Sequence, residues 1–254
     1  MSNLNPYDKK WSPSDYLEQY YTAKDVAEDE CHIFRFVVNF LKKEKKNFSE
    51  MIEIGTGPTI HHLLPFVPYV GKIYIADYFE DNLKNIELWL TSASTAHDWV
   101  PHFTKLLKIE GDSLQQAITE RESALRNKIT SFFVCDVLQN LPLGTEKLFQ
   151  LVTSFYCVEC TTSSKGKWVL AMSNLCSLVA PGGSIILSAL RNTNHYRVLG
   201  NDFSTTYIDE NDLLGSLVSN GFIPDTIHME VHKISAWINE GFDSIMMCSA
   251  KKIA

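Results

Sequence analysis

The stretch Met51-Ile52-Glu53-Ile54-Gly55-Thr56-Gly57-Pro58 decides the fold. A short apolar strand runs directly into a turn with two glycines, which is typical of the first strand–turn–helix unit of a nucleotide-binding α/β sheet. Gly55 permits an unusual backbone geometry, and Gly57 lets the chain approach a bound group closely. Pro58 suits the first position of a helix, so we expect a helix through His62 to Leu64.

Short apolar strands and amphipathic helices alternate after this unit. This pattern predicts a doubly wound α/β fold, with a mostly parallel sheet covered on both faces. The last two strands are close enough in sequence to pair antiparallel at the sheet edge. The expected strands after the first are 72–76, 131–135, 150–155, 185–190, 226–233 and 243–251, and helices are expected over 33–41, 83–90, 166–178 and 213–218.

The chain reads as a single domain over residues 1–254, because no repeat, low-complexity stretch or flexible linker divides it. Residues 1–45 form an aromatic N-terminal segment followed by a helix. Residues 91–130 are more than a simple connection needs, and we interpret them as an inserted loop and helix on the cofactor side.

Composition excludes several classes of function. A formal net charge of -7 offers no electrostatic footprint for nucleic acid or for an anionic membrane. The polar N-terminus lacks the apolar core of a signal peptide, and no apolar run is long enough to span a bilayer, so we expect a cytoplasmic protein. The six cysteines favour free buried thiols, and the single Cys157-x-x-Cys160 pair is short of ligands for a structural zinc, so we expect no metal.

Two aspartates end the strands that follow the glycine turn. Asp77 lies 22 residues after Gly55, the spacing of the acidic residue that binds ribose hydroxyls. Asp136 closes the next strand, where it could accept a hydrogen bond from an adenine amino group while Val137 packs on the ring. The turn could instead bind nothing, and each aspartate could be a helix N-cap. In combination the three features describe an adenosine site.

Position 60 helps to distinguish between cofactors. A dinucleotide fingerprint needs a third glycine or alanine there, but this chain has Ile60, and Pro58 removes a backbone donor for pyrophosphate. A cofactor without phosphates fits better. An NAD-dependent oxidoreductase and a non-catalytic nucleoside-binding module remain open as alternatives.

Most of the chain resembles the class I methyltransferases, and within them the nicotinamide, phenylethanolamine and thioether/indolethylamine methyltransferases. The resemblance rests on residues 12–21 (Ser-Pro-Ser-Asp-Tyr-Leu-Glu-Gln-Tyr-Tyr), 52–60, 76–78 with Asn82-Leu83, 135–137, 181–183 and 239–241. It implies a seven-stranded Rossmann-like sheet, a helical N-terminal lid, S-adenosyl-L-methionine as cofactor, and a monomer. The implied activity is transfer of a methyl group to a small molecule, at a pyridine or amine nitrogen.

The resemblance also implies roles for single residues. The expected cofactor-binding set is Tyr16, Tyr21, Gly55, Thr56, Gly57, Thr59, Asp77, Tyr78, Asn82, Asp136, Val137 and Phe155. Glu159 matches an acidic position that faces the acceptor in the phenylethanolamine branch, so it is the candidate acceptor anchor or base. Ser188 stands where the nicotinamide branch has a substrate-binding aspartate, which puts nicotinamide itself in doubt. Tyr7, Tyr196 and Ser204 complete the candidate acceptor-binding set.

Overall fold

The computed structural model describes residues 10–112 and 115–254. A seven-stranded sheet in the order β3-β2-β1-β4-β5-β9-β8 forms its centre. Pairing is parallel from β3 to β5, and β9 runs antiparallel to both β5 and β8. The seven strands are β1 Phe48–Ile54, β2 Val70–Asp77, β3 Ile129–Val134, β4 Phe149–Phe155, β5 Val179–Leu190, β8 His228–Lys233 and β9 Ser244–Lys251. This is the predicted fold, including the antiparallel pair at the edge.

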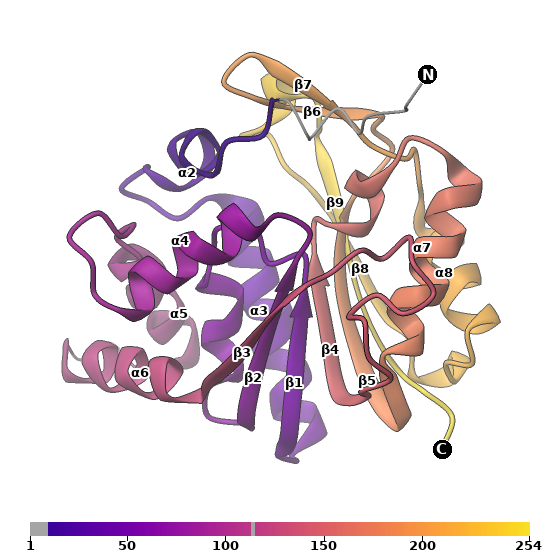
Figure 1. Cartoon of the computed structure of the whole chain (residues 1–254), viewed down its shortest axis with the longest axis horizontal. Coiled ribbons are helices and arrows are strands. Elements are labelled where there is room, and N and C mark those ends of the chain that lie inside the picture. Colours follow the sequence, from indigo (N-terminus) through magenta and orange to yellow (C-terminus); the bar gives the residue numbers. More distant parts are fainter. Residues whose placement is uncertain (1–9, 113–114) are drawn as a thin grey trace.

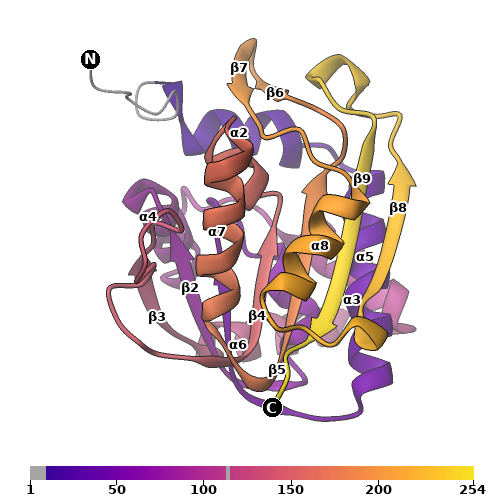
Figure 2. The same ribbon diagram turned by 90° about the vertical axis from the view of Figure 1, so that its right-hand side faces the viewer.

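Helices cover both faces of the sheet. The strands carry apolar side chains on both faces, and both sets need to be buried. Met51 packs into the core on one face, and its neighbour Ile52 packs into the core on the other. The first face is covered by α3 Glu28–Glu44, α4 Glu80–Leu90, α5 Val100–Glu110 and α6 Gln115–Lys128. The second face is covered by α7 Lys165–Ser177 and α8 Glu210–Ser219, as Figures 1 and 2 show.

From β1 the chain adds β2 and β3 toward one edge of the sheet, and from β4 it adds β5 toward the other edge. The strand order therefore reverses between β1 and β4. Ligands of open α/β sheets bind beside such a switch point, at the carboxyl ends of the strands. Helix α2 (Pro13–Tyr21) and the hairpin of β6 (His195–Val198) and β7 (Asn201–Ser204) lie beyond this end of the sheet (Figure 1). The elements that cover the ligand end therefore come from both the N-terminal and the C-terminal parts of the chain.

Two local expectations need correction. The helix expected through His62 to Leu64 is present as a 3-10 helix, His61–Phe66, with Pro65 inside, and Pro58 lies in the turn before it instead of at its first position. A proline interior to an α-helix removes a hydrogen bond, which explains the short tight element. Residues 91–130 hold two helices, α5 and α6, instead of one, and no described residue of this insertion lines the ligand pocket.

The remaining elements are short 3-10 turns, at Val158–Thr161, Pro224–Thr226 and Ile238–Glu240. Within the described ranges, no helix combines the length and the apolar character that crossing a membrane would require.

Candidate functional site

A pocket opens at the carboxyl ends of the strands, beneath α2 and beside the switch point. All twelve residues of the expected cofactor-binding set line it: Tyr16, Tyr21, Gly55, Thr56, Gly57, Thr59, Asp77, Tyr78, Asn82, Asp136, Val137 and Phe155. They come from α2, the turn after β1, the ends of β2, β3 and β4, and the start of α4. The structure therefore brings this set together around one cavity.

Asp77 lies at the end of the pocket where the sequence predicts the nucleoside. Its two carboxylate oxygens accept hydrogen bonds from the Gly57 N–H at 2.7 Å, the Phe79 N–H at 2.8 Å and the Asn82 Nδ2 at 2.9 Å. Burial raises the Asp77 pKa, although these donors act in the opposite direction. The N-cap of α4 is Phe79, which makes no side-chain cap bond, so Asp77 is not the helix cap that its position also allowed.

The glycine turn has the geometry that only glycine adopts easily. Gly55 and Gly57 have φ angles of 72° and 65°. A Cβ atom at Gly55 would lie 2.0 Å from Cys157 Sγ, whereas one at Gly57 would have only Tyr16 Cε1 near it, at 4.0 Å. Gly55 is thus required by packing against the loop after β4, and Gly57 leaves the pocket floor open to a ligand.

Asp136 combines a local and a pocket-facing role. Its side chain accepts hydrogen bonds from the Leu138 N–H at 2.9 Å and from Gln139 Nε2 at 3.2 Å, which shapes the turn after β3. No helix starts there, so the N-cap alternative is wrong for Asp136 as well. Asp136 also lines the pocket, beside Val137.

Aromatic side chains close the pocket from above. Trp11 donates from Nε1 to Asn82 Oδ1 at 2.9 Å, which ties the segment before α2 to the start of α4. The hydroxyls of Tyr16 and Tyr21 lie 3.5 Å apart, and the Tyr20 hydroxyl donates to the Arg197 carbonyl at 2.6 Å. The lid is therefore held both to the α4 end and to the β6–β7 hairpin.

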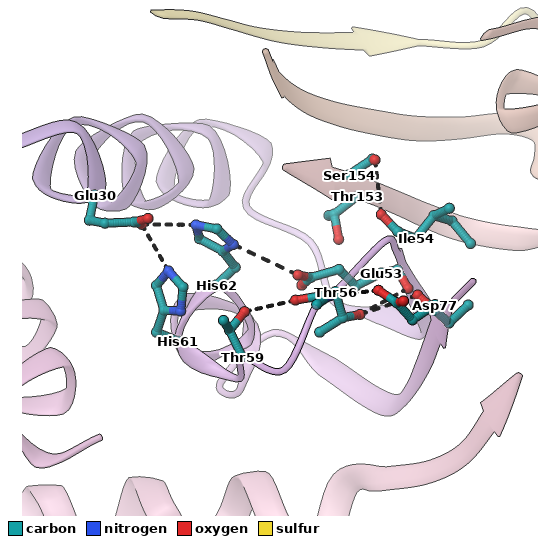
Figure 3. A network of polar contacts seen from close by, with 12 residues as sticks. Glu30, Glu53, Ile54, Thr56, Thr59, His61, His62, Asp77, Thr153 and Ser154 are labelled. Atoms are coloured by element: carbon teal, nitrogen blue, oxygen red, sulfur yellow. Dashed lines mark hydrogen bonds and ion pairs between the residues drawn. The ribbon is translucent and has the colours of Figure 1, made fainter. Parts of the chain in front are cut away.

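A buried ionic network underlies the lid, drawn in Figure 3. The Nε2 atoms of His61 and His62 each lie 2.9 Å from Glu30 Oε2, and His62 Nδ1 lies 3.8 Å from Glu53 Oε1. Tyr21 adds a hydrogen bond to Glu30 Oε1 at 3.3 Å. The network connects α3, the 3-10 helix, β1 and the lid in the protein interior.

The charges of this network follow from burial and proximity. Burial opposes ionisation of Glu30, but the two histidines hold the pKa of its carboxyl well below its usual range. Burial opposes protonation of His62 too, yet Glu30 and Glu53 raise its pKa overall. Burial lowers the pKa of His61 to about 4 and raises that of Glu53 to about 7. A Glu30 carboxylate paired with a His62 imidazolium is the arrangement that these directions favour.

Three residues of this network form the group that could hold a metal ion among the described residues. Ligand atoms of Glu30, His61 and His62 all lie within 4.8 Å of one another. Sequence reasoning passed over this group because Glu30 lies on a helix far earlier in the chain than the adjacent histidines.

Asp29 differs from its neighbour Glu30. It lines the pocket, is only 4% exposed, and accepts hydrogen bonds from Trp237 Nε1 at 2.9 Å and from the Tyr156 hydroxyl at 3.3 Å. Both donors are neutral. Burial, followed by the adjacent Glu30, raises the Asp29 pKa to about 6. Among the described residues, no lysine, arginine or histidine forms an ion pair with Asp29 at 4.0 Å or less.

Of the candidate acceptor-binding residues that the structure describes, one lines the pocket and the others do not. Tyr196 lines the pocket. Glu159 does not: it is 1% exposed, and its Oε1 accepts a hydrogen bond from the Leu190 N–H at 2.8 Å, so its contact with an acceptor finds no support in the geometry. Ser188 is buried inside the sheet and Ser204 is exposed, both outside the pocket wall, and Tyr7 lies outside the described residues.

Sequence reasoning missed much of the end of the pocket opposite Asp77. The residues found there only by the structure include Asp29, Glu30, His62, Tyr156 and Trp237. One signal existed: three consecutive acidic residues, Glu28, Asp29 and Glu30, begin α3 just after the aromatic segment. The partners of Asp29 had no such signal, because Tyr156 and Trp237 are separated from it by 127 and 208 residues.

The pocket wall carries negative charge. Among the described residues it contains the carboxyl groups of Asp29, Glu30, Asp77 and Asp136, with His62 and without any lysine or arginine. Such a wall fits a cationic nucleoside such as a sulfonium, and it offers nothing to neutralise a pyrophosphate. These side chains therefore fit S-adenosylmethionine better than a dinucleotide.

Comparisons with known proteins agree with this reading of the site. The family model of the NNMT/PNMT/TEMT family matches residues 2–253. A nicotinamide N-methyltransferase from Sus scrofa is 29% identical and covers 96% of this chain and 91% of its own length. An indolethylamine N-methyltransferase from Mus musculus is 31% identical, with 80% of this chain and 79% of its own length covered.

The fold has solved counterparts. The crystal structure of magnesium protoporphyrin IX methyltransferase from Synechocystis with bound S-adenosylmethionine has a TM-score of 0.59 at 13% identity, covering 99% of both chains. At that identity the likeness concerns the fold. With the family match extending over nearly every residue and the expected cofactor-binding residues gathered around one pocket, this chain belongs to the NNMT/PNMT/TEMT family.

Proposed function

We propose that this protein transfers the methyl group of S-adenosylmethionine to a nitrogen of a small molecule, either an amine or a pyridine-type heterocycle. The observation that carries the proposal is the pocket wall, in which Asp77, Asp136 and the glycine turn meet an aromatic lid, with no lysine or arginine among its described residues. The names of the nicotinamide and indolethylamine relatives support the nitrogen acceptor.

The residues of the chain have separable tasks in this proposal. Asp77 and Asn82 would hold the ribose, Asp136 and Val137 the adenine edge, and Gly57 with Thr59 the methionine portion. When bound, the cofactor supplies an electrophilic methyl group on a positively charged sulfur. Tyr16 and Tyr21 would present ring faces and hydroxyls to this cation and keep water out.

Alignment is the main contribution of the protein to such a reaction, since in-line displacement needs the nucleophile opposite the leaving sulfur. A neutral amine or pyridine nitrogen needs no dedicated base. A protonated amine must first lose one proton, to a side chain or to water.

Titration calorimetry with S-adenosylhomocysteine, with NADH as the comparison ligand, tests the cofactor. We expect tight binding of the first compound alone, followed by transfer of radiolabelled methyl to members of an amine and pyridine panel. Binding of NADH alone would favour the oxidoreductase alternative, and cofactor binding without turnover of any acceptor would favour the non-catalytic module.

We further propose that the protein acts in the cytoplasm, as a monomer, on small molecules, and that neither nucleic acid nor a membrane takes part. All six cysteines are free thiols, which fits a reducing compartment. Light scattering of the purified protein tests the monomer, and transfer of label to macromolecules in a lysate would contradict the small-molecule acceptor.

A further inference from the structure

Asp29 is a buried carboxylate at the pocket surface without a cationic partner among the described residues. Its neighbour Glu30 is equally buried but has two histidines at 2.9 Å. Each Asp29 oxygen accepts one hydrogen bond from a neutral donor, which leaves further lone pairs for another donor. A buried charge whose hydrogen-bond donors are both neutral gains from a cation that enters the pocket, and the nearby His62 forms its ion pairs with Glu30 and Glu53 and none with Asp29 within 4.0 Å.

The side chains around Asp29 are shaped to receive such a cation. Tyr20, Tyr156 and Trp237 all line the pocket, and the Tyr20 and Trp237 rings meet edge to face with centroids 4.9 Å apart. Ring faces attract an ammonium group, and they also accommodate the apolar part of an amine. The site thus combines one carboxylate with an aromatic enclosure.

Tyr156, which contacts Asp29, has an unusual backbone conformation. It follows β4 directly and has a φ of 51°, in the left-handed region that residues other than glycine seldom occupy. Its N–H donates to the Ser188 carbonyl at 3.1 Å, which anchors the conformation, and its hydroxyl reaches Asp29. Strained residues concentrate at ligand sites, where they aim a side chain.

Resting on the proposed methyl transfer, we propose that the acceptor is an amine that binds as its ammonium ion, and that Asp29, enclosed by Tyr20, Tyr156 and Trp237, is the residue that selects it. Uncharged N-heterocycles are then the poorer acceptors. The bound ammonium must lose one proton, to a side chain or to water, before its nitrogen can accept a methyl group.

Binding measurements test the selection apart from turnover. With saturating S-adenosylhomocysteine, calorimetry compares a panel of alkyl- and arylalkylamines with their alcohols, for example phenethylamine with 2-phenylethanol. We expect at least one amine to bind roughly 30-fold or more tightly than its alcohol, because a buried charge pair is lost with the alcohol. The proposal is overturned if no amine in the panel is preferred.

Two variants identify the residue responsible. Asp29→Asn keeps the size and one acceptor oxygen but removes the charge, and we expect it to abolish the preference for the amine. Glu28→Gln makes the same change of charge one residue away, on an exposed side chain outside the pocket wall, and should keep the preference. Affinity for S-adenosylhomocysteine, unchanged in both variants, shows that they fold; a preference retained by Asp29→Asn would exclude Asp29.

Turnover separates this inference from the proposed function. In Asp29→Asn we expect kcat/KM to fall roughly 30-fold or more for the best amine, largely through KM, and less than about threefold for a neutral pyridine. Methylation of pyridines in preference to amines, with no effect of Asp29→Asn, would refute the inference and leave methyl transfer to nitrogen intact. Absence of both cofactor binding and turnover would instead refute the proposed function.

Discussion

The two ends of the pocket are built from different ranges of the chain. At the nucleoside end, the partners of Asp77 lie 20, 2 and 5 residues away in sequence. At the opposite end, the partners of Asp29 lie 127 and 208 residues away. Contacts of short range can be read from spacing, whereas long-range contacts exist only after the sheet has closed. The residues predicted to bind the cofactor are therefore visible in sequence, whereas the surroundings of Asp29 are decided by tertiary assembly.

The largest effect should come from the nucleoside end. Asp77→Ala removes three hydrogen bonds and leaves their donors unpaired in a buried site. We therefore expect the affinity for S-adenosylhomocysteine to fall roughly 100-fold or more relative to wild type. Calorimetry measures the affinity. Asp77→Asn keeps an acceptor oxygen and should lose less. An affinity within about threefold of wild type in Asp77→Ala would remove Asp77 from the site.

The opposite end should respond to pH through the pair of Glu30 and His62. His62 has a pKa above its usual value in the folded protein, so its contribution to stability is present below the unfolded pKa of 6.5 and is lost as pH rises through the folded pKa. His62→Gln should therefore lower the free energy of unfolding by about 3 kcal/mol near pH 7, and by less at pH 9.

Urea unfolding at the two pH values measures this change. His61→Gln is the matched control, because burial lowers the His61 pKa to about 4 and the ring is neutral at both pH values. Its effect on stability should be the same at pH 7 and pH 9. An effect of His62→Gln that is equally independent of pH would show that the pair is not ionic.

The smallest effect concerns Glu159, the acidic residue that sequence singled out and the pocket wall does not include. Burial raises its pKa from 4.5 to about 7, so the folded state holds the proton more firmly and stability falls as pH rises between these values. Glu159→Gln should therefore raise the free energy of unfolding by about 1 kcal/mol at pH 8 and change it little at pH 5. Urea unfolding at both pH values checks the difference.

The same variant compares the two candidate anchors. The amide oxygen that Glu159→Gln introduces can still accept from the Leu190 N–H, so the KM for amines should stay close to wild type, unlike that of Asp29→Asn. A rise in amine KM that matches Asp29→Asn would return Glu159 to the acceptor site.

Sequence alone determined the parallel sheet with its antiparallel edge pair, the glycine turn, and the two aspartates at strand ends. These features follow from local rules: alternation of apolar side chains, the conformational freedom of glycine, and the fact that carboxyl ends of parallel strands share one edge. The resemblance to a family added the aromatic lid.

Tertiary structure alone decided which acidic side chains line the pocket. Glu159 lies close to the end of β4, yet its side chain bonds to the backbone of Leu190 inside the protein. Asp29 lies in the first turn of α3, before the helix 33–41 that the sequence predicts, yet its hydrogen bonds to Trp237 and Tyr156 place it in the pocket wall. The direction of a side chain in a loop or helix end depends on partners that arrive from elsewhere in the chain, and no spacing within a segment encodes them.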